Sequence, residues 1–409
     1  MITNDPKIQP GLAKNRNRVA GVIAFAHAIK HIYNSGQSSL IMPEIKMGLG
    51  LNGSQYGSLS TAASIAWWLA NMIAGYLGDR FSHKAGLSIA TSLIIIGVSF
   101  LLLGFSKNYF SILIVMFFAG FGPAIFHPPA LGELYRRFPD RTGFAISLHG
   151  MAANIGEVLG PFTVAIFLQF MLWQDLVKAS LFPAILTAIL VFILVPSRKS
   201  LTDYEMKSAR EYFSTLYSLL SNKIILILVI TTALRSVGEA SVGTFLSIYL
   251  RENLQYSVAA VALILSFSQI AGIISQPIMG AMSDKFGRKP ILVTASLLST
   301  LAAFSIALAP PGIALFIAIL IRGSFTFSLH HIVIAAGLDS SRGVASSTVV
   351  AIIYASGIFG AFSPVIAGYI SDIYGIHSAF LYGGGVLIIP TVLLYLSKFP
   401  KPLNSKNET

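Results

Sequence analysis

Long apolar segments recur along the whole chain and leave it few possible folds. A helix that crosses a bilayer needs about 20 predominantly apolar residues. About twelve such segments occur, at 18–42, 55–78, 85–106, 110–134, 143–170, 178–196, 223–250, 257–282, 290–309, 312–336, 343–370 and 378–397. Each is continuously apolar, whereas the strands of a membrane β-barrel alternate apolar and polar residues. The sequence therefore predicts an all-α membrane protein with twelve transmembrane helices.

The distribution of charge predicts how these helices are oriented. Only 11% of the residues are charged, and the formal net charge is +12. With the N-terminus inside, 21 of the 28 Lys and Arg residues fall in inside segments and 4 in outside loops. Lys and Arg collect in cytoplasmic loops, so we expect both termini in the cytoplasm and the protein in an inner membrane. The basic excess then reports orientation, and no nucleic-acid partner is predicted.

The first apolar stretch is too long for the core of a signal peptide, and Lys30 and His31 interrupt it. We therefore expect it to be retained. Cysteine is absent, which excludes disulfides and thiolate metal ligands.

The longest polar interruption, residues 197–222, divides the apolar segments into two sets of six. We predict an N-terminal half at 1–196, a cytoplasmic linker at 197–222 and a C-terminal half at 223–409. A short surface helix and a plain solvated tether both fit the mixed charges of the linker.

A loop motif occurs once in each half. GYLGDRFSHK runs 75–84 and GAMSDKFGRK runs 280–289, both after the second segment of their half. The second copy has the full pattern, with Gly280, Asp284, Lys285, Gly287, Arg288 and Lys289. The first copy keeps Gly75, Asp79, Arg80 and Lys84, but has Ser82 and His83 in place of a glycine and a basic residue.

This motif, with twelve segments and a central linker, resembles the signature loop of the major facilitator superfamily. The resemblance implies two pseudo-symmetric six-helix halves that rock around a central path. It also implies that Asp79 and Asp284, beside Arg80 and Lys285, act as a gate on the cytoplasmic side. The alternative is that these residues are only positive-inside anchors, which would explain the bases but not the glycines or the acids.

A narrower resemblance rests on FHPPALGE at 126–133, SLHGMAANIGEVLGP at 147–161 and HAIKHIYNSG at 27–36. These stretches look like the fosmidomycin-resistance branch of the superfamily, which implies proton-coupled drug export. His31 stands where that branch has an acid. The fifth segment keeps only part of the antiporter motif, Gly156, Gly160 and Pro161.

Ionisable residues within the apolar segments are candidates for the site, because they are costly in a bilayer and face cavities or each other. On the first segment His27, His31, Asn34 and Ser38 follow a helical period and form one stripe beside Lys30. Arg235 and Glu239, at i and i+4, predict an ion pair. Arg322 has no acid within four residues, so we expect it to meet a substrate anion. His127 precedes Pro128 and Pro129, which we expect to break the fourth helix.

These residues divide into two predicted roles. Three bases against two mid-span acids favour an anionic solute, whose predicted contacts are Lys30, Asn34, His127, Arg235, Arg322 and His330. Histidine and buried glutamate can titrate near neutral pH, so the predicted proton-coupling groups are His27, His31, Glu157 and Glu239. Structural hydrogen bonding by the histidines and snorkelling by Lys30 are the alternatives. No metal site and no cofactor are predicted.

The sequence predicts a secondary active transporter of a small anionic solute or drug, with proton-coupled export as the first hypothesis. The alternative is proton-coupled uptake of a metabolite or siderophore-like polycarboxylate. A membrane enzyme or channel is a third class, but the chain has no nucleophile elbow and no P-loop. We expect no enzymatic activity, and a monomer whose partners are substrate, protons and the lipid bilayer.

Overall fold

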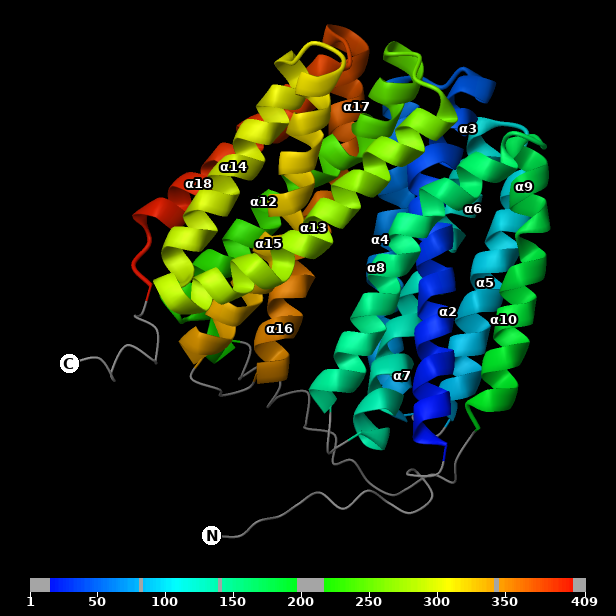
Figure 1. Ribbon diagram of the computed structural model, residues 1–409, viewed down its shortest axis with the longest axis horizontal. Helices are drawn as coiled ribbons and strands as arrows, with labels where there is room; N and C mark the ends of the chain where they lie inside the picture. The colour runs from blue at the N-terminus through cyan, green and yellow to red at the C-terminus, as the bar shows by residue number, and fades with distance from the viewer. Residues whose placement is uncertain (1–14, 81–83, 139–141, 197–216, 342–345, 400–409) are drawn as a thin grey trace. The chain divides into compact units, whose positions relative to one another are not determined.

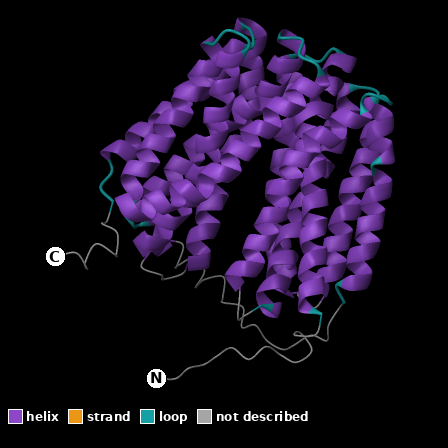
Figure 2. Ribbon diagram, in the orientation of Figure 1, coloured by secondary structure: helices purple, strands orange, loops and turns teal. Residues whose placement is uncertain are grey.

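The computed structural model describes residues 15–80, 84–138, 142–196, 217–341 and 346–399 (Figure 1). Nearly all of these residues are helical, and the described part of the chain contains no strand (Figure 2). This confirms the all-α prediction.

The helices from the first part of the chain correspond to its first six predicted segments. They are α2 (Arg16–Gly36), the π-helical segment η1 (Gln37–Ile41), α3 (Met42–Leu49), α4 (Gly53–Arg80), α5 (Ala85–Phe105), α6 (Tyr109–Ala119), α7 (Phe121–Arg137), α8 (Thr142–Phe167), α9 (Trp173–Ala179) and α10 (Leu181–Leu194).

The remaining helices correspond to the last six segments. They are α12 (Lys223–Ile248), the π-helical segment η3 (Tyr249–Asn253), α13 (Val258–Phe286), α14 (Arg288–Leu308), α15 (Ile313–Ser341), α16 (Ser346–Ala355), the 3₁₀ segment η4 (Ser356–Phe362), α17 (Ser363–Tyr374) and α18 (His377–Leu396). Both series begin with a long helix that ends in a π-helical turn, which agrees with an internal repeat.

Within the described residues, 10 helical stretches are long and apolar enough to cross a membrane. They coincide with the last ten predicted segments. The first two segments fall on α2 and α4, which are helical but more polar. In α2 the reason is the stripe of ionisable residues; in α4 it is a run of Ser, Thr, Gln and Asn.

The chain divides into two compact units. The first unit comprises Met1–Leu51, Ala62–Thr202 and Ser257–Leu263. The second unit comprises Asn52–Thr61, Asp203–Tyr256 and Ile264–Thr409. The predicted linker lies mostly outside the described residues, so the predicted half boundaries stay a prediction.

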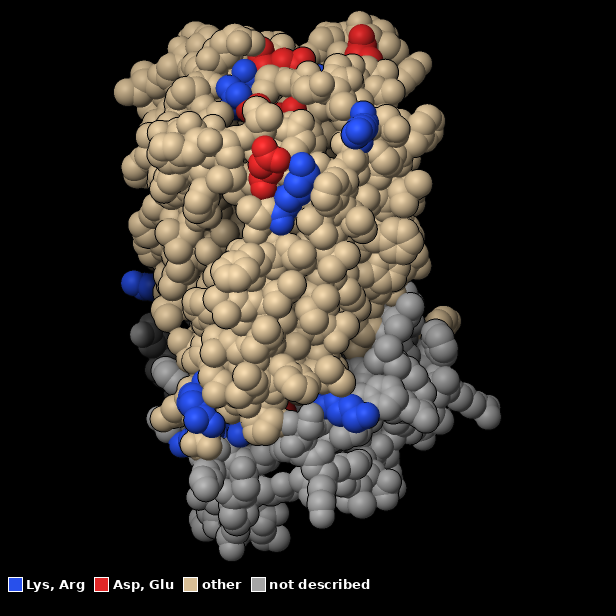
Figure 3. All heavy atoms as spheres, turned by 90° about the vertical axis from the view of Figure 1, so that its right-hand side faces the viewer, with Lys and Arg blue, Asp and Glu red and all other residues tan. Residues whose placement is uncertain are grey.

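In the first unit α2 packs along α8, and α5 packs between α7 and α10. Its core joins side chains of all five helices, such as Ile23, Leu93, Phe126, Ala145 and Val191. On the face of this unit turned to the viewer in Figure 3, charged side chains lie toward the two ends and the broad middle is uncharged. A helix bundle in lipid needs this pattern.

In the second unit α18 packs against both α12 and α14, and α14 packs against α15. Its core includes Leu228, Leu292, Leu329, Ile353 and Leu394. Buried hydroxyls join α14 to α18, because the hydroxyls of Ser296 and Thr391 lie 2.7 Å apart.

Candidate functional site

The first unit gathers five ionisable side chains from three helices. We call them the histidine cluster: His27, Lys30 and His31 on α2, His127 on α7 and Glu157 on α8. His27 and Lys30 are only 2% and 4% exposed. Of the predicted stripe, His27 and His31 with the neighbouring Lys30 meet in this cluster, whereas Asn34 and Ser38 are exposed.

Short contacts join the cluster into one network. Lys30 Nζ lies 2.7 Å from His127 Nε2 and 3.3 Å from His31 Nε2. The His31 Nδ1 atom lies 2.6 Å from Glu157 Oε1. His31 Nε2 and His27 Nε2 are 3.1 Å apart, and His27 Nδ1 donates to the backbone oxygen of His149 at 2.8 Å.

Two glycines of α8 create the close packing that this network needs. A Cβ atom on Gly156 would lie 2.3 Å from the backbone oxygen of Ala28 and 2.6 Å from His31 Cβ. One on Gly160 would lie 2.8 Å from the Gly36 nitrogen. The glycine pair of the partial antiporter motif therefore sets the distance between α2 and α8, and with it the contact between His31 and Glu157.

The His149 ring stacks on His27 with the ring centroids 3.5 Å apart. It is 5% exposed, and neither of its ring nitrogens has a hydrogen-bond partner among the described residues. The predicted break at Pro128 and Pro129 is wrong, because α7 continues through both prolines. The helix is instead divided at Gly120, where a Cβ atom would lie 2.2 Å from the backbone oxygen of Ala63.

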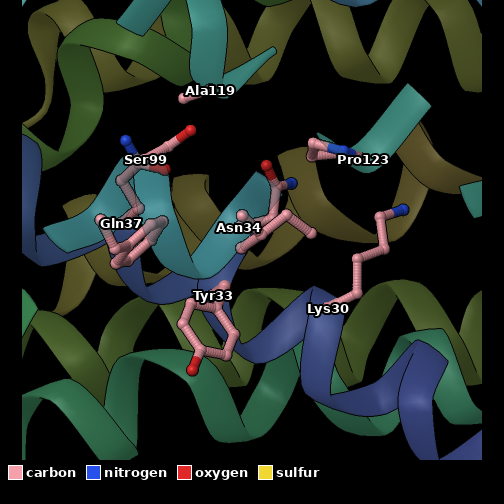
Figure 4. Close-up of a pocket in the computed structure, with 9 residues that line it drawn as sticks. Lys30, Tyr33, Asn34, Gln37, Ser99, Ala119 and Pro123 are labelled. Carbon is pink, nitrogen blue, oxygen red and sulfur yellow. The ribbon is translucent and has the colours of Figure 1, made fainter. Parts of the chain in front are cut away.

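A small hollow opens beside the histidine cluster (Figure 4). Lys30, Tyr33 and Asn34 of α2 and Gln37 of η1 line one side. Residues of α5, α6 and α7, among them Ser99 and Pro123, line the rest. Two predicted substrate contacts, Lys30 and Asn34, thus reach the same hollow.

The second unit has a cluster of different chemistry, which we call the guanidinium cluster: Arg235 and Glu239 on α12, Ser299 on α14, and Arg322 and Thr326 on α15. Arg322 Nη2 donates to Glu239 Oε2 at 2.7 Å. The hydroxyls of Ser299 and Thr326 donate to Glu239 Oε1 at 2.7 and 2.8 Å.

This arrangement corrects one prediction. The ion pair of Glu239 is with Arg322, so the predicted pair with Arg235 is wrong. Arg322 has no acid within four residues on its own helix, but α12 supplies Glu239, and its contact with a substrate anion stays a prediction. Arg235 donates from Nη1 to the Thr326 backbone oxygen at 2.8 Å and makes no ion pair with a described residue. His330 packs edge-on against Tyr354, with ring centroids 4.7 Å apart.

The loop motif at 75–84 and 280–289, which we call the gate motif after its predicted role, is described only in part. The helices that carry Gly75, Asp79, Arg80 and Asp284 are described, but the surroundings of these four residues are not. Gly287 has φ +96°, which explains that glycine of the motif, whereas a Cβ atom on Gly280 would meet nothing within 4 Å. Lys285 is exposed and lies near the Phe286 ring.

Arg288 of the gate motif donates from Nε to Asp339 Oδ2 at 2.8 Å and from Nη1 to the hydroxyl of Ser283. Sequence reasoning missed Asp339, because no local spacing links a residue at the end of α15 to the loop between α13 and α14.

His27, His31 and His127 each bring one ring nitrogen within 4.8 Å of the others, a spacing that can hold a metal ion. The ammonium of Lys30, a positive charge fixed to the chain, already contacts two of these rings. The absence of a metal site therefore stays a prediction.

Membrane-spanning helices around buried ionisable clusters define a multi-pass membrane carrier. The chain belongs to the Major Facilitator Superfamily, whose family model matches residues 23–234 and 228–409. The resemblance of the loop motif to this superfamily is confirmed.

Curated relatives come from several bacteria. The chain is 22% identical over 359 residues to an uncharacterized MFS-type transporter, YfnC, of Bacillus subtilis (strain 168), covering 85% of this chain and 86% of that protein. It is 24% identical over 275 residues to the fosmidomycin resistance protein of Escherichia coli (strain K12), covering 65% and 66%. It is 25% identical over 337 residues to the multidrug resistance protein MdtG of Klebsiella pneumoniae (strain 342), covering 80% of each.

Solved structures share the fold. The nucleoside transporter NupG superposes with a TM-score of 0.73 at 12% identity, covering 93% of this chain and 100% of that one. A bacterial homologue of the human lysosomal transporter Spinster gives a TM-score of 0.73 at 14% identity, covering 94% and 97%. These likenesses establish the fold.

Proposed function

We propose that this protein is a proton-coupled secondary transporter of a small organic anion, which works by alternating access and exports its solute from the cytoplasm through an inner membrane. The names of the drug- and fosmidomycin-resistance relatives support export. The positive-inside distribution of Lys and Arg supports cytoplasmic termini. Lys30 and Asn34 in the first unit, and Arg235 with His330 in the second, are the proposed anion contacts.

The observation that carries proton coupling is the facing pair of imidazole nitrogens. His27 Nδ1 faces a carbonyl oxygen and His31 Nδ1 faces a carboxylate, so both atoms carry a hydrogen when Glu157 is ionised. If both rings are neutral, two lone pairs then face each other across 3.1 Å. One additional proton between the two Nε2 atoms converts this repulsion into a hydrogen bond.

Glu157 balances the charge of that proton. An imidazolium at His31 would lie against the Glu157 carboxylate at 2.6 Å, in a geometry that favours the charged pair. Glu157 is also 24% exposed, so water can deliver or remove the proton. Glu239 is less suited to this task, because three donors already hold its oxygens.

One contact favours the alternative of proton-coupled uptake. The Lys30 ammonium lies 3.3 Å from His31 Nε2, so a proton on His31 places two like charges side by side. The repulsion is relieved if Lys30 turns to an anion in the hollow. Proton and anion then favour each other's binding, which is the coupling that cotransport requires.

Reconstituted vesicles test both versions. We would use fosmidomycin, an anionic phosphonate, as the probe and impose a pH gradient across the bilayer. Export by exchange predicts that fosmidomycin and protons move in opposite directions, whereas cotransport predicts movement in the same direction. Fosmidomycin fluxes that ignore the gradient would remove proton coupling altogether.

A further inference from the structure

Helix α4 is divided between the two units. The segment Asn52–Thr61, which contains the start of α4, belongs to the second unit. The residues of α4 from Ala62 onward belong to the first unit. In alternating access the two units move relative to each other. The start of α4 therefore cannot keep its place in the second unit at every stage unless α4 itself bends. The contacts that hold the start of α4 therefore bear on the transport cycle.

The start of α4 is held by an acid from another helix. The first N–H groups of a helix lack intrahelical partners. In α4 the Gln55 N–H donates to the Asn52 side chain at 2.8 Å, and the Asn52 N–H donates to the Gln55 side chain. The N–H groups of Gly53 and Ser54 donate instead to the carboxylate of Asp372 on α17, as does the Ser54 hydroxyl at 2.6 Å. We call this contact the α4 cap.

The charge of Asp372 has an electrostatic reason to prefer this contact. It lies in the last turn of its own helix, α17, where the helix dipole disfavours a negative charge. The N-terminus of α4 offers it the opposite end of a dipole. The interaction between the two helices is therefore stronger than the three hydrogen bonds alone.

Glycines allow the backbones to approach closely enough for the cap. A Cβ atom on Gly57 would lie 2.0 Å from the backbone oxygen of Pro364, and one on Gly368 would lie 2.1 Å from that of Gly53. One turn further along α17 from Gly368 is Asp372. Tyr56, which is 1% exposed, adds a contact to α12 through Phe245, with ring centroids 5.8 Å apart.

We propose that Asp372 is a positioning residue of the transport cycle: its carboxylate caps α4, holds the start of that helix in the second unit, and must release it for transport to proceed. The proposal requires alternating access but neither the proton nor the anion of the proposed function. It differs from the cytoplasmic gate motif in residues and in chain position.

A first experiment follows the start of α4 without any substrate. The chain has no cysteine, so Leu59→Cys, at a site that is 0% exposed, gives one thiol on the capped segment. Asp372→Ala should raise its rate of labelling by N-ethylmaleimide about tenfold, within the roughly two- to thirtyfold range expected for loss of a helix cap. Labelling of Ser296→Cys, buried between α14 and α18, should not change. An unchanged rate at Leu59→Cys would overturn the proposal.

A second experiment closes the cap covalently. In the double variant Ser54→Cys with Asp372→Cys, oxidation should stop fosmidomycin transport and dithiothreitol should restore it. The matched control, Ser296→Cys with Thr391→Cys, joins two side chains of the second unit and should transport equally well in both states. Full transport by the oxidised Ser54–Asp372 pair would contradict the proposal. If wild-type vesicles do not carry fosmidomycin, this probe is not a substrate and the labelling rates alone decide the role of the cap.

Discussion

In the first unit buried charges meet imidazole rings, whereas in the second unit a carboxylate meets a guanidinium. Both clusters lie on the first helix of their part of the chain and on helices packed against it. An imidazole can be neutral or protonated, so the charge of the histidine cluster can change. An arginine stays charged, so the guanidinium cluster keeps its ion pair. Two repeated parts of one chain can therefore differ in chemistry, with a charge that can change in the first unit and fixed charges in the second.

The variant with the largest expected loss of stability removes the acid of the Arg322–Glu239 ion pair. Glu239→Ala should lower the free energy of unfolding by about 3–5 kcal/mol, because Arg322 would remain as a buried charge without its partner. Unfolding in detergent micelles measures it. Adding Arg322→Met should recover part of the loss, since it removes the charge that lost its partner. A loss for Glu239→Ala no greater than that of Glu157→Ala would remove the distinction between the clusters.

Next comes the packing on which the histidine cluster depends. Gly156→Ala should cost about 1–3 kcal/mol of stability, because its Cβ atom would overlap the Ala28 oxygen and the His31 Cβ atom. The control is Gly150→Ala on the same helix, where an added Cβ atom meets nothing within 4 Å and stability should not fall. Thermal unfolding of both variants distinguishes them, and equal midpoints would argue against close packing of α2 on α8.

Removing the acid of the first unit should cost less than removing that of the second. Glu157→Ala should lower stability by about 1.5 kcal/mol, because His31 can release its proton and so is not left as a charge without its partner. The unfolding measurement made on Glu239→Ala gives the comparison directly. A loss above about 3 kcal/mol would indicate a fixed ion pair here too.

Arg235 and Arg322 should differ in what a lysine substitution changes, and this difference is the smallest of the expected effects. Arg235→Lys should weaken fosmidomycin binding about tenfold, or about 1.4 kcal/mol, because an ammonium cannot make the two-pronged contact of a guanidinium. Its stability should change little. Arg322→Lys should instead lower stability through the pair with Glu239. Isothermal titration and unfolding on both variants test this, and unchanged affinity in Arg235→Lys would exclude it as an anion contact.

Much of the fold followed from local pattern. Length and apolarity place the ten helical stretches of the described residues that can cross a membrane, and the first two predicted segments fall on the more polar α2 and α4. The period of His27, His31 and Asn34 predicts that one face of α2 is polar. Family membership followed from the loop at 280–289. These signals lie within one helix or one loop, where spacing alone decides which side chains share a face.

Partners between helices could not be predicted in the same way. Spacing suggested Arg235 for Glu239, but the packing of α15 brings Arg322 closer. The contact of His31 with Glu157 joins residues 126 positions apart, and it depends on a glycine whose role appears only when α2 lies beside it. The contact of Asp372 with the start of α4 is equally invisible, because each residue taken alone is an ordinary helix-end residue.

If the histidine cluster carries the coupling proton, the charge of Glu157 must be needed for gradient-driven transport. Glu157→Gln keeps an oxygen that accepts from His31 but removes the charge that balances an imidazolium. In vesicles, this variant should still exchange fosmidomycin across the bilayer at equal pH and should lose accumulation driven by a pH gradient. Gradient-driven accumulation at the wild-type level in Glu157→Gln would contradict the account.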